Sequence, residues 1–256
     1  MPKIPRDPWY KLYNEDCFET FKRIKDHSID LILVDPPYGT TACKWDSIIP
    51  LEPMWKEVWR VVKNDTAVVI FGAQPFSSLL VCSCLQNFKY ELIFEKTRAI
   101  GFLYAKKRPL ACHENVQIFS KGWTKYNPVK TEGIPYSRGK CKEMDVPSLK
   151  NGRLVKSHTR KPNKTGERLP RSVLTFKNAD SEGKSKHPTQ KPISLIEYLI
   201  KTYSNAQDLV LDFAMGSGTT GVACGNLGRN FIGCDNDTEH GYFQIAQERI
   251  SQAYHA

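Results

Sequence analysis

Long apolar runs are missing from this chain of 256 residues, and none reaches the length of about 20 that crosses a bilayer as a helix. Residues 1–9 are polar and rich in proline, unlike a secretory signal peptide. The eight cysteines include no Cys-x-x-Cys, and the six histidines show no metal-ligand spacing. We therefore expect no membrane partner, no metal site, and a cytoplasmic protein with free thiols.

A carboxylate, two prolines and an aromatic residue follow an apolar run at residues 29–34, which is typical of a buried strand. They are Asp35, Pro36, Pro37 and Tyr38, at the strand end where open α/β sheets place their chemistry. Asp35 and the Pro36 carbonyl can accept the two N–H bonds of an exocyclic amine, and Tyr38 can stack on the base that carries it. A plain strand followed by a proline-rich turn is the alternative.

A second segment, residues 210–221, reads as strand, glycine-rich turn and helix. Asp235 ends a further apolar run 23 positions after Asp212, a spacing that suits the hydroxyls of a ribose. The alternative is that the glycine turn serves only packing and that Asp235 is a helix N-cap. The candidate cofactor ligands here are Asp212, Phe213, Gly216, Ser217, Gly218, Thr219 and Asp235.

The third segment, residues 187–192, precedes an apolar-periodic stretch at 193–203 and resembles a helix start. Thr189, Gln190 and Lys191 can hold a carboxylate there; a solvated helix cap is the alternative. The loop 39–50 carries Lys44, Trp45 and Asp46 and is a candidate lid over a flipped base; a local packing anchor at Trp45 is the equal alternative. His113 and Glu114 are interpreted as structural.

These three segments, in this order, resemble the β class of amino-group DNA methyltransferases that use S-adenosylmethionine. The resemblance covers about residues 11–121 and 186–250. It implies a cofactor contact to the adenine ring from Asp16 and Cys17, although Asp16 can equally cap a helix at 19–25. It also implies direct methyl transfer to a flipped base, with Asp35 as catalytic residue and also a cofactor neighbour. The sequence departs from the family at two places: Phe213-Ala214 replaces the usual Pro-Phe, and Glu15 replaces a glycine.

Asp ahead of Pro-Pro-Tyr favours adenine N6 over cytosine N4 by this resemblance. A cytosine-N4 enzyme, a DNA-binding protein with a degraded site, and an RNA or protein-amide methyltransferase are the alternatives. The resemblance implies DNA as partner and nucleoid association when bound to it. A homodimer and a cognate restriction endonuclease are further candidate partners.

The excess positive charge lies in one part of the chain. Residues 121–190 hold 17 Lys and Arg against six Asp and Glu, whereas the remainder holds 20 against 21. We expect an inserted DNA-binding, target-recognition region at 122–186 within a single domain of residues 1–256. A solvated basic insert is the alternative. The candidate DNA contacts are Arg153, Lys156, Arg160, Lys161 and Lys164.

Alternating strand and helix patterns predict an α/β fold, a doubly wound, mostly parallel sheet of seven strands. The resemblance makes this a Rossmann-like methyltransferase fold with circularly permuted motif order, in which strands 30–34 and 208–212 are neighbours. The expected strands are 11–13, 30–34, 66–71, 90–94, 115–120, 208–212 and 230–234, with helices at 53–62, 76–86, 193–203 and 242–250.

Overall fold

The computed structural model describes residues 7–40, 46–136, 162–182, 190–237 and 239–255. Thr189, Lys44, Trp45 and four of the predicted DNA contacts (Arg153, Lys156, Arg160 and Lys161) lie outside these ranges. The chain forms two compact units, one of residues 1–127 with 172–256 and the other of residues 128–171.

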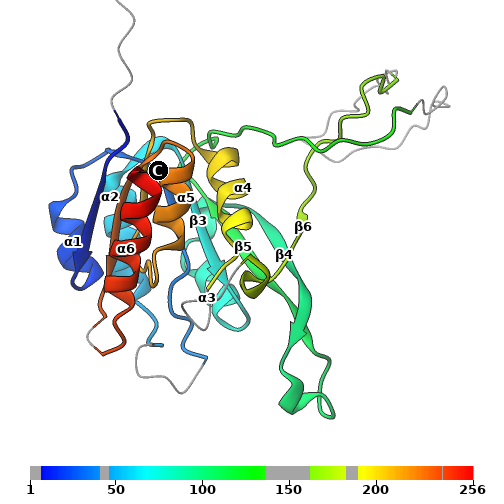
Figure 1. Ribbon diagram of the computed structural model, residues 1–256. Helices are drawn as coiled ribbons and strands as arrows, with labels where there is room; N and C mark the ends of the chain where they lie inside the picture. Colours follow the sequence, from blue (N-terminus) through cyan, green and yellow to red (C-terminus); the bar gives the residue numbers. More distant parts are fainter. Residues whose placement is uncertain (1–6, 41–45, 137–161, 183–189, 238, 256) are drawn as a thin grey trace, which may run out of the picture. The chain divides into compact units, whose positions relative to one another are not determined.

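An eight-stranded sheet, in the order β1-β8-β7-β2-β3-β5-β4-β6, organises the larger unit (Figure 1). Its strands are β1 (Tyr10–Asn14), β2 (Ile29–Val34), β3 (Val62–Gly72), β4 (Phe88–Ile100), β5 (Ala111–Phe119), β6 (Val173–Phe176), β7 (Leu209–Asp212) and β8 (Asn230–Asp235). Only the β3–β5 and β4–β5 pairs are antiparallel. The mostly parallel α/β sheet is therefore confirmed.

Six α-helices cover both faces of this sheet in the described part of the chain. They are α1 (Cys17–Arg23), α2 (Leu51–Val61), α3 (Phe76–Ser83), α4 (Ile193–Tyr203), α5 (Thr219–Asn226) and α6 (Tyr242–His255). Leu31 and Leu33 of β2 pack in the core under α4, α5 and α6, whereas Ile32 and Val34 pack in the core under α1, α2 and α3. Burial on both faces explains why β2 is apolar at nearly every position. None of the described helices combines the length and apolar character needed to span a membrane.

The centre of the sheet positions the predicted motifs. β2 and β7 are parallel neighbours, with Leu31 opposite Val210 and Ile32 opposite Leu211, as expected. The chain continues from β2 to β3 on one side and from β7 to β8 on the other. A crevice forms at such a switch point outside the carboxyl ends of the strands, which here are followed by Asp35 and Phe213.

The outer part of the sheet differs from the expectation in two ways. β4 has 13 residues rather than the five predicted, and with β5 it forms a long hairpin whose tip carries the short helix η2 (Phe102–Tyr104). β6, which lies within the range 122–186 predicted as an insert, pairs in parallel with β4 as an eighth strand. Both were missed because the added residues are largely exposed and lack a buried-strand pattern.

The smaller unit has little regular structure among its described residues. Two isolated bridges hold it together, between Thr131 and Arg168 and between Tyr136 and Asn163. The Arg168 guanidinium lies 4.5 Å from the centre of the Tyr136 ring. Lys164 is exposed in this unit.

Candidate active site

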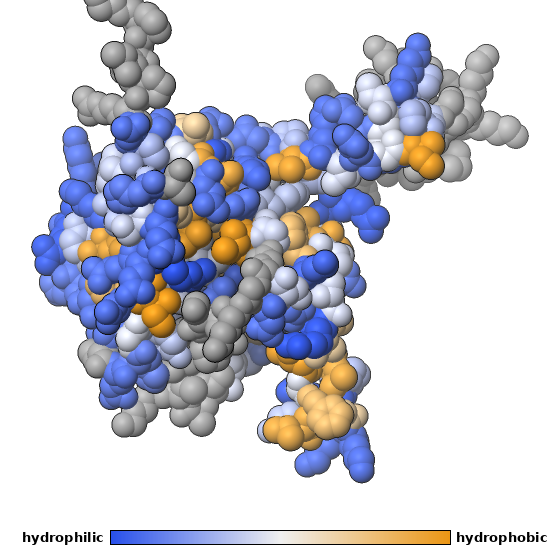
Figure 2. Space-filling view, in the orientation of Figure 1, coloured by the Kyte–Doolittle hydropathy of each residue, from blue (hydrophilic) through white to orange (hydrophobic). Residues whose placement is uncertain are grey.

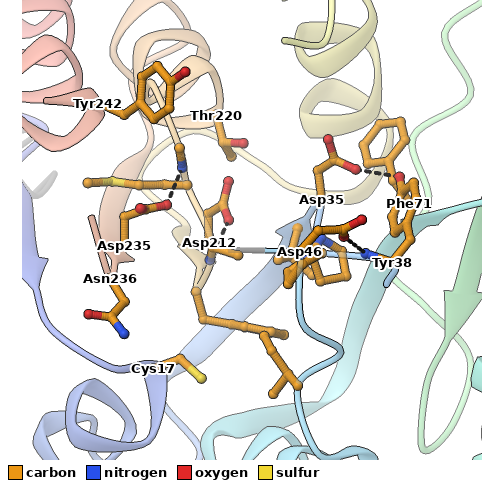
Figure 3. Close-up of a pocket in the computed structure, with 18 of the residues that line it drawn as sticks. Cys17, Asp35, Tyr38, Asp46, Phe71, Asp212, Thr220, Asp235, Asn236 and Tyr242 are labelled. Carbon is orange, nitrogen blue, oxygen red and sulfur yellow. Dashed lines mark hydrogen bonds between the residues drawn. The ribbon is translucent and has the colours of Figure 1, made fainter. Parts of the chain in front are cut away.

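A cavity of about 760 Å³ lies at the carboxyl edge of the sheet (Figure 3). Its volume is typical of a small-molecule or cofactor site. Most of the predicted site residues line it: Asp16, Cys17, Asp35, Pro36, Pro37, Tyr38, Gln190, Lys191, Asp212, Phe213, Gly216, Ser217, Thr219 and Asp235. The structure thus brings together segments from the first 40 residues and from the last 70 of the described chain.

Asp35 is held from two sides at the end of β2. The Tyr38 hydroxyl donates a hydrogen bond of 2.5 Å to Oδ1, and the Lys191 ammonium forms an ion pair with Oδ2. The side chain remains 26% exposed, so a ligand in the cavity can reach it. Burial raises the pKa of Asp35, while Lys191 opposes that rise.

Lys191 connects Asp35 to a second carboxylate that sequence reasoning treated as structural. Its ammonium, only 8% exposed, also lies 3.1 Å from Glu114 Oε2, and Lys96 Nζ lies 2.5 Å from Glu114 Oε1. Burial alone would lower the pKa of Lys191, but Asp35 and Glu114 outweigh it and the pKa is raised. Burial likewise favours a higher pKa for Glu114, but Lys191 and Lys96 bring it below its usual value.

Asp46 anchors the turn that follows Asp35. Its carboxylate accepts hydrogen bonds from the backbone N–H groups of Tyr38 (2.8 Å), Gly39 (2.8 Å) and Thr40 (2.9 Å). These bonds fix the backbone next to the two prolines. The Tyr38 ring stacks on Phe76, with ring centres 5.3 Å apart. Asp46, in the candidate lid at 39–50, therefore holds the turn that follows Asp35.

Asp235 holds the glycine turn rather than a helix start. Its Oδ2 accepts a 2.7 Å hydrogen bond from the Gly216 N–H, whereas its Oδ1 accepts none from the described residues. The carboxylate of Asp237, two positions later, accepts the N–H of Phe243 at the start of α6. Asp235 therefore presents an acceptor oxygen to the cavity.

Among the predicted ligands that the structure describes, Gly218 is the one that does not line the cavity. It adopts a left-handed conformation, with φ of +79°, directly before α5. A Cβ atom there would lie 2.8 Å from the Cβ of Ala246 in α6. Arg249 of the same helix donates a 2.5 Å hydrogen bond to the Ser217 carbonyl. Gly218 thus lets the turn pack tightly against α6.

Asp212 lies between Asp235 and Asp35 in the cavity (Figure 3). Burial raises its pKa to about 7, although the Thr220 hydroxyl and the Ala214 N–H lower it. No Lys or Arg forms an ion pair with Asp212 among the described residues. A positively charged ligand would stabilise its ionised form.

The remaining predicted residues combine packing with access to the cavity. Asp16 accepts a 2.8 Å hydrogen bond from the Phe18 N–H and thereby caps α1 while lining the cavity. Burial raises the pKa of the Cys17 thiol to about 12, which makes it a poor nucleophile. The Phe213 ring packs 5.3 Å from that of Phe21. Ser217 Oγ donates a long hydrogen bond of 3.4 Å to Gln190.

The doubly wound sheet, the glycine turn and the acidic residue at the end of β8 define a Rossmann-like, nucleotide-binding α/β enzyme. The N6/N4 DNA methylase family matches residues 29–248, and the chain belongs to this family. It is therefore an amino-group DNA methyltransferase that uses S-adenosylmethionine. Its substrate is DNA. The family match confirms the resemblance seen in the sequence and S-adenosylmethionine as the cofactor that this resemblance implied.

Relatives cover nearly the whole chain. Type II methyltransferase M1.MboII of Moraxella bovis is 32% identical in an alignment that covers 90% of this chain and 93% of that protein. Type II methyltransferase M.HpaI of Haemophilus parainfluenzae is 27% identical in an alignment that covers 95% of this chain and 75% of that protein.

Solved structures show the same fold. The M1.HpyAVI–SAM complex matches with a TM-score of 0.61 and 26% identity, over 94% of this chain and 99% of that one. The PvuII DNA methyltransferase, described as cytosine-N4-specific, matches with a TM-score of 0.65 and 17% identity. The match covers 99% of this chain and 95% of that one.

The cavity suits S-adenosylmethionine on its own chemistry. The cofactor carries a cationic sulfonium and an ammonium group, and Asp212 is a buried carboxylate without a cationic partner among the described residues. Asp235 offers an acceptor oxygen of the kind that binds ribose hydroxyls in such folds.

Proposed function

We propose that this enzyme methylates N6 of adenine at a specific site in DNA, acting on a base flipped out of the duplex. The observation that carries the proposal is the Asp35 carboxylate, held by Tyr38 and Lys191 at the wall of the cavity. Adenine rather than cytosine rests on the aspartate ahead of Pro-Pro-Tyr, which is a family resemblance.

Asp35 and the Pro36 carbonyl would accept the two hydrogens of the target amine. The lone pair of that nitrogen is delocalised into the ring, and these two acceptors draw the nitrogen toward the tetrahedral geometry of a nucleophile. The target amine is out of reach inside a duplex, so flipping into the cavity must come first. When bound, S-adenosylmethionine supplies an electrophilic methyl group. As the new N–C bond forms, the bond between that methyl group and the sulfonium sulfur breaks and leaves a neutral thioether. The methylated nitrogen also loses a proton, for which Asp35 is the proposed acceptor.

Lys191 would act by positioning Asp35. Its ammonium is engaged by Asp35 and Glu114, so we assign it to the orientation and charge state of the catalytic carboxylate. The cofactor's carboxylate would then be bound by Gln190 and Ser217, together with Thr189 from the predicted set. Asp235 would bind the ribose, and Asp16 with Cys17 the adenine ring.

Target recognition would come from the basic region at 122–186. Its support is the charge distribution, because residues 121–190 carry a net +11 while the rest of the chain carries −1. Lys164 is the predicted DNA contact that the structure describes, and it is exposed.

The proposed function is tested by the identity of the product and by Asp35→Ala. DNA methylated by the enzyme is digested to nucleosides and analysed by mass spectrometry, and we expect N6-methyladenine. Asp35→Ala should lower the methylation rate at least about 10²-fold, because the electrostatic contact acts mainly in the transition state. Calorimetry should show S-adenosylmethionine binding within about threefold of the wild type.

Asp26→Ala is the matched control, because Asp26 is an exposed carboxylate paired with Arg60 outside the cavity. N4-methylcytosine as product would overturn the adenine assignment and leave the role of Asp35 intact. Activity of Asp35→Ala within about tenfold of the wild type would overturn the catalytic assignment.

A further inference from the structure

The tip of the β4–β5 hairpin exposes large apolar side chains. Phe102 is 82% exposed and Leu103 is 92% exposed, and Tyr104 and Leu110 beside them are also exposed. The hairpin extends away from the sheet, and its tip forms an apolar patch bordered by hydrophilic residues (Figures 1 and 2). A contiguous exposed patch of this kind marks a binding surface more often than chance.

The same tip is basic. Residues 97–110 include Arg98, Lys106, Lys107 and Arg108 and no Asp or Glu. Arg98 pairs with Asp180, and the Arg108 guanidinium lies 5.1 Å from the centre of the Tyr104 ring. Lys106 and Lys107 form no ion pair with any described residue. Two copies of this tip would repel each other, whereas a polyanion that also offers flat apolar faces would suit it.

The hairpin is anchored at the catalytic cavity. Lys96 and Glu114, on its two strands, form the ion pair that continues to Lys191, and Ile100 lines the cavity. Asn178 Oδ1 accepts hydrogen bonds from the Arg98 N–H (3.1 Å) and the Thr97 hydroxyl (3.2 Å). These contacts hold the base of the hairpin against the site where a flipped base would enter.

We propose that this tip is a DNA-contacting finger beside the target nucleotide. Lys106 and Lys107 bind phosphates, and Phe102 and Leu103 pack against the bases next to the flipped position. Apolar side chains that enter a base stack offset part of the cost of unstacking. The proposal depends on the DNA methyltransferase activity and not on whether adenine or cytosine is the target.

Two double variants separate the roles of the finger. Lys106→Ser with Lys107→Ser should weaken DNA binding about tenfold at 150 mM salt, and should flatten the slope of log affinity against log salt by about one to two. Phe102→Ser with Leu103→Ser should leave that slope unchanged and reduce base flipping about tenfold. Binding is measured by fluorescence anisotropy. Flipping is measured with 2-aminopurine at the methylated position, once sequencing of a methylated plasmid has located it.

Matched controls are Lys25→Ser with Lys56→Ser for the charge, and Leu85→Ser for an exposed apolar residue elsewhere. All variants should bind S-adenosylmethionine like the wild type, which shows that they fold. Salt slopes and flipping equal to the wild type in both double variants would overturn the proposal. So would sedimentation showing that the apolar variant splits a wild-type dimer without changing DNA affinity per protomer. A cytosine product would overturn the adenine assignment but not the finger.

Discussion

At the residue scale, the site depends on four buried or half-buried charges in a row: Asp35, Lys191, Glu114 and Lys96. Two carboxylates and two ammonium groups balance one another, so each desolvated charge has a partner. Removing one partner leaves another charge uncompensated, which should appear in the pH dependence of the reaction as well as in its rate.

Lys191→Met and Glu114→Gln should shift the acid limb of the pH–rate profile in opposite directions. We expect Asp35 to work ionised, so the rate falls as pH falls through its pKa. Lys191 lowers that pKa and Glu114 raises it. Lys191→Met should therefore move the limb to higher pH and Glu114→Gln to lower pH, each by about one unit. Single-turnover methylation between pH 4.5 and 9 measures the shift.

Lys63→Met is the control for these variants, because Lys63 pairs with Asp30 at the opposite end of β2. A limb that stays in place in both site variants would contradict the positioning role of Lys191. A parallel fall in rate at every pH would indicate a merely structural contribution.

At the element scale, the turns after β2 and β7 are each held by a carboxylate from elsewhere in the chain. Asp46 binds three backbone N–H groups of the turn after β2, and Asp235 binds the Gly216 N–H in the turn after β7. Both turns are thereby ordered before a ligand enters, which lowers the entropic cost of binding.

Asp235→Ala should weaken S-adenosylmethionine binding by about 1–3 kcal/mol through lost hydrogen bonds to the ribose. Asp235→Asn is the matched variant, because its amide oxygen can still accept the Gly216 N–H while the charge is removed. We expect its affinity to lie between those of the wild type and Asp235→Ala in calorimetry. Equal affinity in all three proteins would restrict Asp235 to holding the turn.

At the scale of the whole molecule, the positive charge is concentrated but not all of it is available to DNA. Lys125 pairs with Asp208 at 2.6 Å, and Lys130 pairs with Glu167 at 3.0 Å. Neither lysine belongs to the predicted phosphate contacts, which lie between Arg153 and Lys164.

Reversal of Lys156, Arg160 and Lys161 to Glu should flatten the salt dependence of DNA binding by about 0.9 per lost phosphate contact. S-adenosylmethionine binding should be unchanged, because these residues lie outside the three motif segments described in the sequence. Reversal of Lys22, Lys25 and Lys56, which are exposed on the larger unit, is the control. Coinciding slopes for the three proteins would show that the basic region does not hold DNA, and would leave the hairpin finger as the main candidate.

The sequence alone was sufficient to predict the family, the cofactor, the class of fold and the position of the cavity. β2 and β7 are buried strands followed by short motifs, and both signals are local: apolar runs report burial, while glycine and proline report turns. Their adjacency followed from the family resemblance and is confirmed by the register. The roles of the individual site residues stay predictions.

Only the tertiary structure decided which distant side chains meet. Glu114 gave no local signal, because its partners Lys191 and Lys96 come from other segments. Asp46 gave none because its partners are backbone N–H groups, which the sequence pattern does not report. Lys191 was predicted to bind a carboxylate of the cofactor, and the fold pairs it with Asp35 and Glu114 of this chain. The long hairpin and β6 were missed for the related reason that exposed strands are paired through their backbones, which side-chain periodicity does not report.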